Sequence, residues 1–242
     1  MATYVLVPGF WLGAWAWRDV TETLRARGHD VYPMTLTGLA ERDHLAGPDV
    51  SLETHTLDIV RLIEVEDLRD VLLVGHSGGG MPVAQAADRI PDRIARVVYV
   101  ESGPLPDGTA QFDTVPPEEQ QRLRAAIGDG HLMPPPAWDP LADPVNVAGL
   151  DEPTRALLRA RATAQPLRTA TDPVERTGGR PVPTALVAST FPLGVVREMI
   201  EQEHPFFTGL ADGQLHEVPT GHWPMLSEPK ALADVLDLIA RG

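Results

Sequence analysis

The chain has 242 residues, enough for one domain with a sizeable core or for such a domain with a small insertion. Its 20 basic and 34 acidic residues give a formal net charge of −14, which disfavours binding to nucleic acid phosphates and to anionic membranes. No apolar run approaches the roughly 18 residues that a membrane span needs, and because no basic and apolar stretch precedes the first predicted strand we expect the protein not to be exported. The absence of cysteine excludes disulfides, thiolate nucleophiles and cysteine-held metals, and we expect a soluble cytoplasmic protein that acts on a small molecule.

The first hundred residues alternate between strand-like and helix-like segments. This alternation predicts a parallel sheet with helices on both faces. Apolar, β-branched runs predict strands at residues 3–7, 31–35, 71–74 and 94–100. Apolar positions at helical spacing predict helices at residues 15–27, 52–65 and 81–89.

The pattern breaks between residues 104 and 181. This stretch is rich in proline, shows helical spacing only near 118–127 and 152–164, and contains no convincing strand. Apolar residues such as Phe112 and Trp138 distinguish it from a linker, so we expect a small helical cap over a functional site. The prolines concerned are Pro116, Pro117, Pro134, Pro135, Pro136, Pro140 and Pro144.

Alternation resumes after residue 182. Strands are expected at 183–188 and 214–218, and helices at 195–203 and 230–240. The chain therefore predicts an α/β core in two pieces, 1–103 and 182–242, with 104–181 inserted between them as a cap.

Ser77 is the candidate nucleophile. It lies in Gly75-His-Ser-Gly-Gly79, between the apolar strand at 71–74 and the helix at 81–89. A Gly-x-Ser-x-Gly segment between a strand and a helix is typical of a sharp turn that exposes a serine hydroxyl at the end of a sheet. Glycine at 75 and 79 allows the tight turn and close packing of the helix on the strand.

A serine hydroxyl needs a base, and His222 is the best of the eight histidines. It follows the last predicted strand directly, so it falls at the carboxyl edge of the sheet, where ligands of open α/β sheets bind. His76 lies within the sharp turn at residues 75–79, called the elbow from here on, and we expect it to shape that turn.

The carboxylate that should orient His222 is less clear. This architecture usually supplies it just after the strand that precedes the histidine strand, but residues 187–196 contain none. Glu101, at the carboxyl end of the strand at 94–100, is the favoured substitute. Other carboxylates remain open, namely Asp107, Glu198 and Asp212.

These motifs together resemble the α/β-hydrolase superfamily, and within it the small cap-bearing group that contains plant methylesterases and hydroxynitrile lyases. The resemblance rests on segments 6–17, 36–42, 75–79, 99–108 and 221–229. It implies an oxyanion hole made by the backbone amides of Phe10 and Gly78, which would stabilise charge on a carbonyl oxygen. The cap lacks the lysine typical of the lyases and Gly9 lacks a hydroxyl, so cyanohydrin cleavage is disfavoured.

The sequence therefore predicts a serine hydrolase that cleaves an ester, thioester or lactone of a small, mostly apolar substrate through an acyl-enzyme on Ser77. Two other classes stay open: a lyase or cyclase in which His222 acts as a base on carbon acids, and a ligand-binding protein with little turnover. No metal or organic cofactor is needed, and a monomer and a homodimer are both compatible with the sequence. An aromatic pocket beneath the cap is expected from Phe10, Trp11, Trp138, Phe191 and Trp223.

Overall fold

A computed structural model describes residues 1–204 and 206–242. Within that part of the chain the main sheet has six strands in the order β2-β1-β3-β4-β7-β8, and all its pairings are parallel. This confirms the α/β sheet predicted from the alternating segments. The strands are β1 (Thr3–Val7), β2 (Asp30–Pro33), β3 (Val71–His76), β4 (Ile94–Val100), β7 (Thr184–Ala188) and β8 (Gln214–Glu217).

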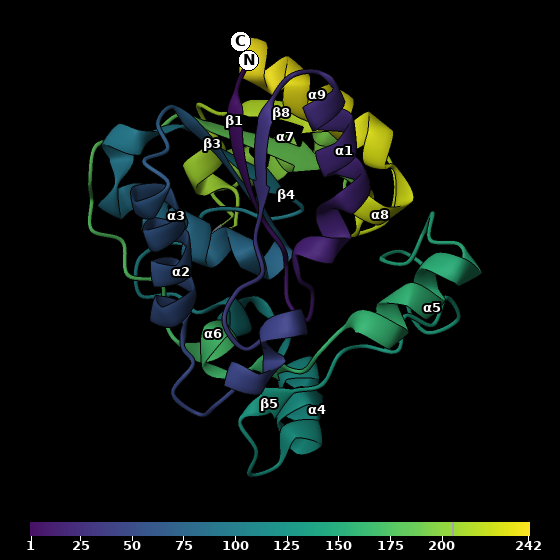
Figure 1. The fold of residues 1–242 in the computed structure, drawn as a ribbon. Coiled ribbons are helices and arrows are strands. Elements are labelled where there is room, and N and C mark those ends of the chain that lie inside the picture. Colours follow the sequence, from purple (N-terminus) through teal and green to yellow (C-terminus); the bar gives the residue numbers. More distant parts are fainter. Residues whose placement is uncertain (205) are drawn as a thin grey trace.

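Helices cover both faces of this sheet, and Figure 1 shows α1 and α9 on one side of it and α2 and α3 on the other. Successive strand residues point to opposite faces, so Tyr4 and Leu6 pack with α1 and α9, whereas Val5 and Val7 pack with α2 and α3. Both faces are buried, which explains the continuously apolar strands. The helices of the two layers are α1 (Arg18–Ala26), α8 (Pro224–Ser227) and α9 (Pro229–Arg241), and α2 (Leu52–Val65), α3 (Gly80–Arg89) and α7 (Leu193–Glu201).

Between β4 and β7 the chain leaves the sheet and forms α4 (Pro117–Ile127), α5 (Glu152–Arg161) and α6 (Arg168–Thr171). Figure 1 shows α4, α5 and β5 beyond the end of the sheet that is opposite to both chain termini. This segment matches the predicted helical cap, whose limits of 104 and 181 remain a prediction.

The expectation that the cap contains no strand was wrong. An antiparallel pair joins β5 (Leu132–Met133) to β6 (Gln165–Pro166). Two-residue strands are too short to show a period of two, and their pairing spans more than thirty residues of sequence. Sequence periodicity therefore could not reveal them.

Several element boundaries also differ from those predicted. The helix expected at 15–27 begins as a tight 3-10 turn at Ala14–Trp17 and continues as α1 only from Arg18. Strand β2 ends at Pro33, and α7 begins at Leu193, directly after Pro192. In the described residues no helix is both long and apolar enough to cross a bilayer.

Candidate active site

Ser77 sits on a strained turn between β3 and α3. Its φ of 48° lies in the left-handed region, which non-glycine residues rarely adopt, and such strain persists only where the surroundings enforce it. A Cβ added at Gly79 would lie 2.4 Å from the carbonyl oxygen of Pro8, and one at Gly75 would lie 2.9 Å from that of Gly79. Both glycines are therefore needed so that the elbow can pack against itself and against the end of β1.

A side-chain hydrogen bond, which the sequence did not predict, also holds the elbow. The buried Ser102 donates from its hydroxyl to the carbonyl oxygen of Ser77 across 2.7 Å. Ser102 directly follows Glu101 at the end of β4, which lies beside β3 in the sheet. No local sequence pattern indicates this contact, because it depends on the register of two strands.

His222 lies in the loop after β8, and its Nε2 is 2.8 Å from Oγ of Ser77. Two backbone contacts fix this loop: the His222 amide donates to the carbonyl of Asn146 in the cap, and His76 Nε2 donates to the carbonyl of His222 over 2.7 Å. The structure therefore brings together Ser77 and His222, which are 145 residues apart in sequence.

His76 contributes more than the shape of the turn that the sequence predicted. Burial, together with a smaller effect of the neighbouring His222, lowers the pKa of His76 to about 3. A neutral imidazole carries one N–H, and the contact with the His222 carbonyl assigns that hydrogen to Nε2. His76 thus acts as a fixed donor to the backbone of His222 at neutral pH.

Glu101, directly after β4, lies next to His222 on the side away from Ser77. Its Oε2 lies 3.4 Å from Nδ1 of His222, and its side chain is 4% exposed. Oε1 accepts the amide N–H groups of Ser189 and Thr190, and Oε2 accepts the Thr190 hydroxyl over 2.6 Å. The carboxylate therefore lies against the end of β7, at the position where the sequence offers no acidic residue.

Electrostatics favour the charged form of Glu101. Burial alone raises the pKa of this carboxyl, but the contact with His222 and the hydrogen bonds from Thr190 and Ser189 outweigh it, so the pKa is lowered. The backbone of Glu101 also has a φ of 49°, a second strained residue at the same sheet edge. A charged carboxylate here can hold the Nδ1–H tautomer of His222 and leave Nε2 facing Ser77.

The loop after β1 brings Phe10 next to Gly78. A Cβ added at Gly78 would meet three ring carbons of Phe10 at 2.4, 2.5 and 2.6 Å, so the ring fills the space that a side chain at residue 78 would take. The cap strands hold the same loop. Buried Gln165 of β6 accepts the Trp11 amide, and Met133 of β5 accepts the Trp11 indole N–H.

Two cavities of about 530 and 520 Å³ open on either side of Ser77. Ser77, His222, Gln111 and Asn146 line both, so these residues stand at the boundary between them. The first cavity, named here the Phe191 cavity, is walled by Phe191, Phe206, Phe207, Met199 and Val196. The second, named here the Trp11 cavity, is walled by Phe10, Trp11, Phe112, Trp223 and Pro134 to Pro136.

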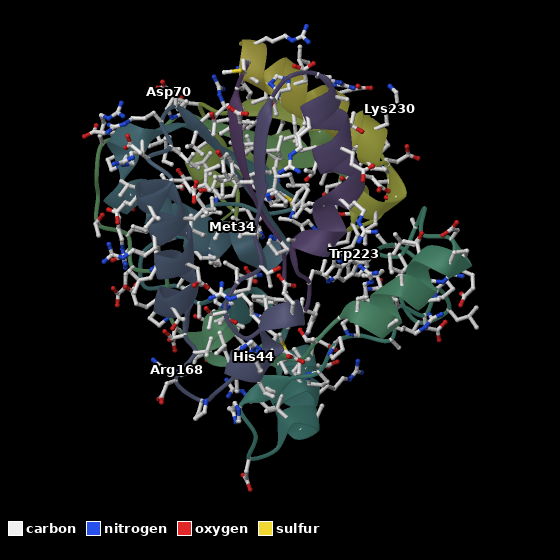
Figure 2. The ribbon with its side chains drawn as sticks, in the orientation of Figure 1. Met34, His44, Asp70, Arg168, Trp223 and Lys230 are labelled. Atoms are coloured by element: carbon white, nitrogen blue, oxygen red, sulfur yellow. The ribbon has the colours of Figure 1, made fainter. Side chains whose placement is uncertain are left out.

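The predicted aromatic pocket is therefore divided between two cavities, and one member lies elsewhere. Trp138 is absent from the described residues that line either cavity. It is 2% exposed and packs edge-on against Trp223, with ring centroids 6.1 Å apart. Trp223, labelled in Figure 2, lies between α1 and the cap helix α5 and has both a core contact and a cavity face.

The site offers little to a metal ion. No group of three or more histidine, aspartate or glutamate side chains in the described chain is arranged to hold one. The carboxylate, imidazole and hydroxyl are instead connected in a line, which suits proton transfer from a hydroxyl.

Comparison with known proteins assigns the family. The family model described as "Alpha/beta hydrolase family" matches residues 4–235. A "Carbendazim hydrolyzing esterase" from Nocardioides sp. is 34% identical over 98% of both chains. "Methylesterase 8" of Arabidopsis thaliana is 38% identical, but the alignment covers only 41% of this chain and 37% of that protein.

Solved structures show the same fold. An extracellular alpha/beta-hydrolase from a Paenibacillus species matches with a TM-score of 0.85, 24% identity and full coverage of both chains. A methylesterase from Arabidopsis matches with a TM-score of 0.76 and 19% identity over 100% of this chain and 99% of that chain. From its matched family and its esterase relatives, this chain belongs to the alpha/beta hydrolase family as a carboxylic ester hydrolase-like enzyme.

Proposed function

We propose that this protein hydrolyses a small carboxylic ester through a covalent acyl-enzyme on Ser77. The observation that carries the proposal is the line of contacts from Glu101 to His222 Nδ1 and from His222 Nε2 to Ser77 Oγ. Hydroxyl, imidazole and carboxylate in this order are the parts of a nucleophile, its base and the group that orients the base.

In the proposed first step, His222 takes the proton from Ser77 Oγ as that oxygen attacks the ester carbonyl. The negative charge that develops on the carbonyl oxygen would be stabilised by the amides of Phe10 and Gly78, each donor contributing about 3–4 kcal/mol in comparable sites. His222 then returns its proton to the alcohol oxygen as the C–O bond breaks, which leaves an acyl ester on Ser77.

In the second step, a water replaces the alcohol. His222 takes a proton from this water, the hydroxide attacks the acyl carbonyl, and the proton returns to Ser77 Oγ as the acid leaves. Glu101 stays ionised throughout and stabilises the imidazolium, in keeping with its lowered pKa.

The two cavities on either side of Ser77 support a substrate with an apolar group on each side of the ester bond. The similarity to an esterase named for carbendazim makes that compound a sensible member of a first substrate panel, together with methyl esters. Simple chromogenic short-chain esters complete the panel.

The experiment compares the wild-type enzyme with Ser77→Ala on this panel. We expect a rapid burst of alcohol release from the wild type, followed by slower steady turnover, and no enzymatic release from the variant. A flat trace from the wild type on every ester at high enzyme concentration would contradict the proposal. Turnover by Ser77→Ala close to the wild-type rate would contradict the covalent mechanism and favour a lyase or cyclase that uses His222 alone.

A further inference from the structure

The charged groups around the two cavities have one sign. Among the described residues that line them, the carboxylates are Glu101, Glu119 and Asp143, and no lysine or arginine is present. His204 and His222 are the lining imidazoles. In the described part of the chain, a substrate therefore meets aromatic and aliphatic walls and carboxylate oxygens, but no guanidinium or ammonium group.

Asp143 and Glu119 both belong to the Trp11 cavity and both come from the cap. Asp143 accepts the backbone amide and the side-chain amide of Asn146, at 3.3 and 2.9 Å, and no ion pair in the described chain involves it. Glu119 forms a 3.4 Å pair with Arg122, whose side chain is 76% exposed. Such a pair is well solvated, so it neutralises Glu119 only weakly.

A second arginine, Arg124, lies close to the wall of the Trp11 cavity without lining it. The guanidinium of Arg124 is 4.9 Å from the centre of the Phe112 ring and lines a separate, smaller hollow. Phe112 lines both this hollow and the Trp11 cavity, whereas Arg124 lines only the hollow. The cap therefore holds this arginine outside both the Phe191 cavity and the Trp11 cavity.

We infer that the enzyme selects neutral and cationic esters and discriminates against esters that carry a second, anionic group. This inference rests on the proposed ester hydrolysis and adds the charge class of the substrate. A substrate carboxylate in the Trp11 cavity would be repelled by the fixed carboxylates of the half-buried Asp143 and of Glu119, and because Glu119 is exposed its share of this repulsion acts partly through solvent. The net charge of −14 acts in the same direction at longer range.

The same charge pattern serves product release. Each hydrolysis creates a carboxylate where the substrate had a neutral ester, and the described residues that line the two cavities include no lysine or arginine to retain it. Repulsion from Glu101 and from the cap carboxylates then favours departure of the acid. Weak product inhibition is the direct consequence.

The test uses three para-nitrophenyl esters whose acyl chains have the same length and end in a methyl group, a carboxylate or a trimethylammonium group. A second set carries the same three end groups on the alcohol side, because either cavity could receive the charged group. We expect kcat/KM for the anionic ester to be about tenfold or more below that of the neutral ester in at least one set. For the cationic ester, kcat/KM should equal or exceed that of the neutral ester. Added salt should reduce the difference in kcat/KM between the anionic and neutral esters.

The variants Glu119→Gln and Asp143→Asn identify the source of the discrimination. Each should raise kcat/KM for the anionic ester relative to the neutral one, and the double variant should raise this ratio by about threefold or more. Glu118→Gln is the matched control, because it removes the same charge from the adjacent, exposed position of α4 outside the cavity wall, and it should leave the ratio unchanged. The ratio is the readout, so a general loss of rate in Asp143→Asn does not affect it.

Equal kcat/KM for the anionic and neutral esters in both sets would overturn the inference. It would also be overturned if discrimination survived in the double variant at the wild-type level, since the cap carboxylates would then not cause it. Failure to hydrolyse any ester in the panel would instead contradict the proposed function itself, so the two failures can be told apart.

Discussion

The turn at Ser77 and the cap residues Glu119 and Asp143 both line the Trp11 cavity, but the turn is tightly packed whereas Glu119 is open to solvent. At the elbow an added Cβ at Gly79 would lie 2.4 Å from the backbone of Pro8, and Ser77 is held at a φ of 48°. On the cap wall Glu119 is exposed and makes only a solvated ion pair. We therefore expect substitutions at the tightly packed turn to reduce the rate of the reaction. Substitutions at Glu119 should change the preferred substrate without destabilising the fold.

The largest expected effect on activity comes from Glu101, which follows β4 and accepts hydrogen bonds from Ser189 and Thr190 after β7. Glu101→Gln keeps the size of the side chain but replaces the charged acceptor of His222, and kcat should fall about ten-thousand-fold. Steady-state kinetics on a chromogenic ester measures this, with circular dichroism to check the fold. Glu198→Gln is the control, because it removes an exposed carboxylate from α7 and should leave kcat unchanged. Activity of Glu101→Gln within tenfold of wild type would remove Glu101 from the mechanism.

A double substitution tests how tightly the elbow is packed. Gly78→Ala places a Cβ within 2.6 Å of the Phe10 ring, so the loop that carries the Phe10 amide must shift, and kcat/KM should fall about a hundredfold. Phe10→Ala in the same chain removes the obstruction and should recover most of that loss. A double variant no more active than Gly78→Ala would show that the clash with the ring is not what limits the enzyme.

The buried histidines predict a loss of stability in mild acid. Burial lowers the pKa of His55 to about 4 from its ordinary value of 6.5, so below pH 6.5 the unfolded chain binds a proton that the folded chain does not. The free energy of unfolding should therefore decrease as the pH falls from 6.5 toward 4, by up to about 1.4 kcal/mol per pH unit for each such histidine. His76, with a pKa of about 3, acts in the same direction.

Urea unfolding at several pH values tests this dependence. His55→Gln should reduce the slope, whereas His44→Gln, at the exposed position labelled in Figure 2, should not. Parallel slopes for the wild type and both variants would mean that His55 is not the group responsible.

The smallest effect on activity is expected from Trp138→Phe. The sequence predicted Trp138 in the substrate pocket, but the structure places it in the core. Its indole nitrogen is buried and has no hydrogen-bond partner among the described residues, so Trp138→Phe removes none of the described bonds and should cost about 1–2 kcal/mol of stability. KM should change less than twofold. Trp223→Phe, which alters the wall of the Trp11 cavity, should change KM more. A larger change in KM for Trp138→Phe than for Trp223→Phe would indicate that Trp138 contacts the substrate.

Sequence reasoning worked where local pattern and position in the sheet determine the outcome. Ser77, Glu101 and His222 each directly follow a strand or lie in the loop after one, and parallel strands bring their carboxyl ends to one edge, so their convergence could be expected. It failed where only tertiary packing decides. Nothing near His76 or Ser102 in sequence indicates which carbonyl each one reaches, and the face that Trp138 presents depends on how the cap folds back.

Rapid mixing with an ester, followed by acid quench and mass spectrometry of the digested protein, tests the covalent mechanism at Ser77 directly. A covalent acyl-enzyme would give a transient mass increase equal to the acyl group on the peptide that contains Ser77, formed during the burst and absent in Ser77→Ala. Ester turnover without any acyl adduct at Ser77 during the burst, or with the adduct on another residue, would contradict it.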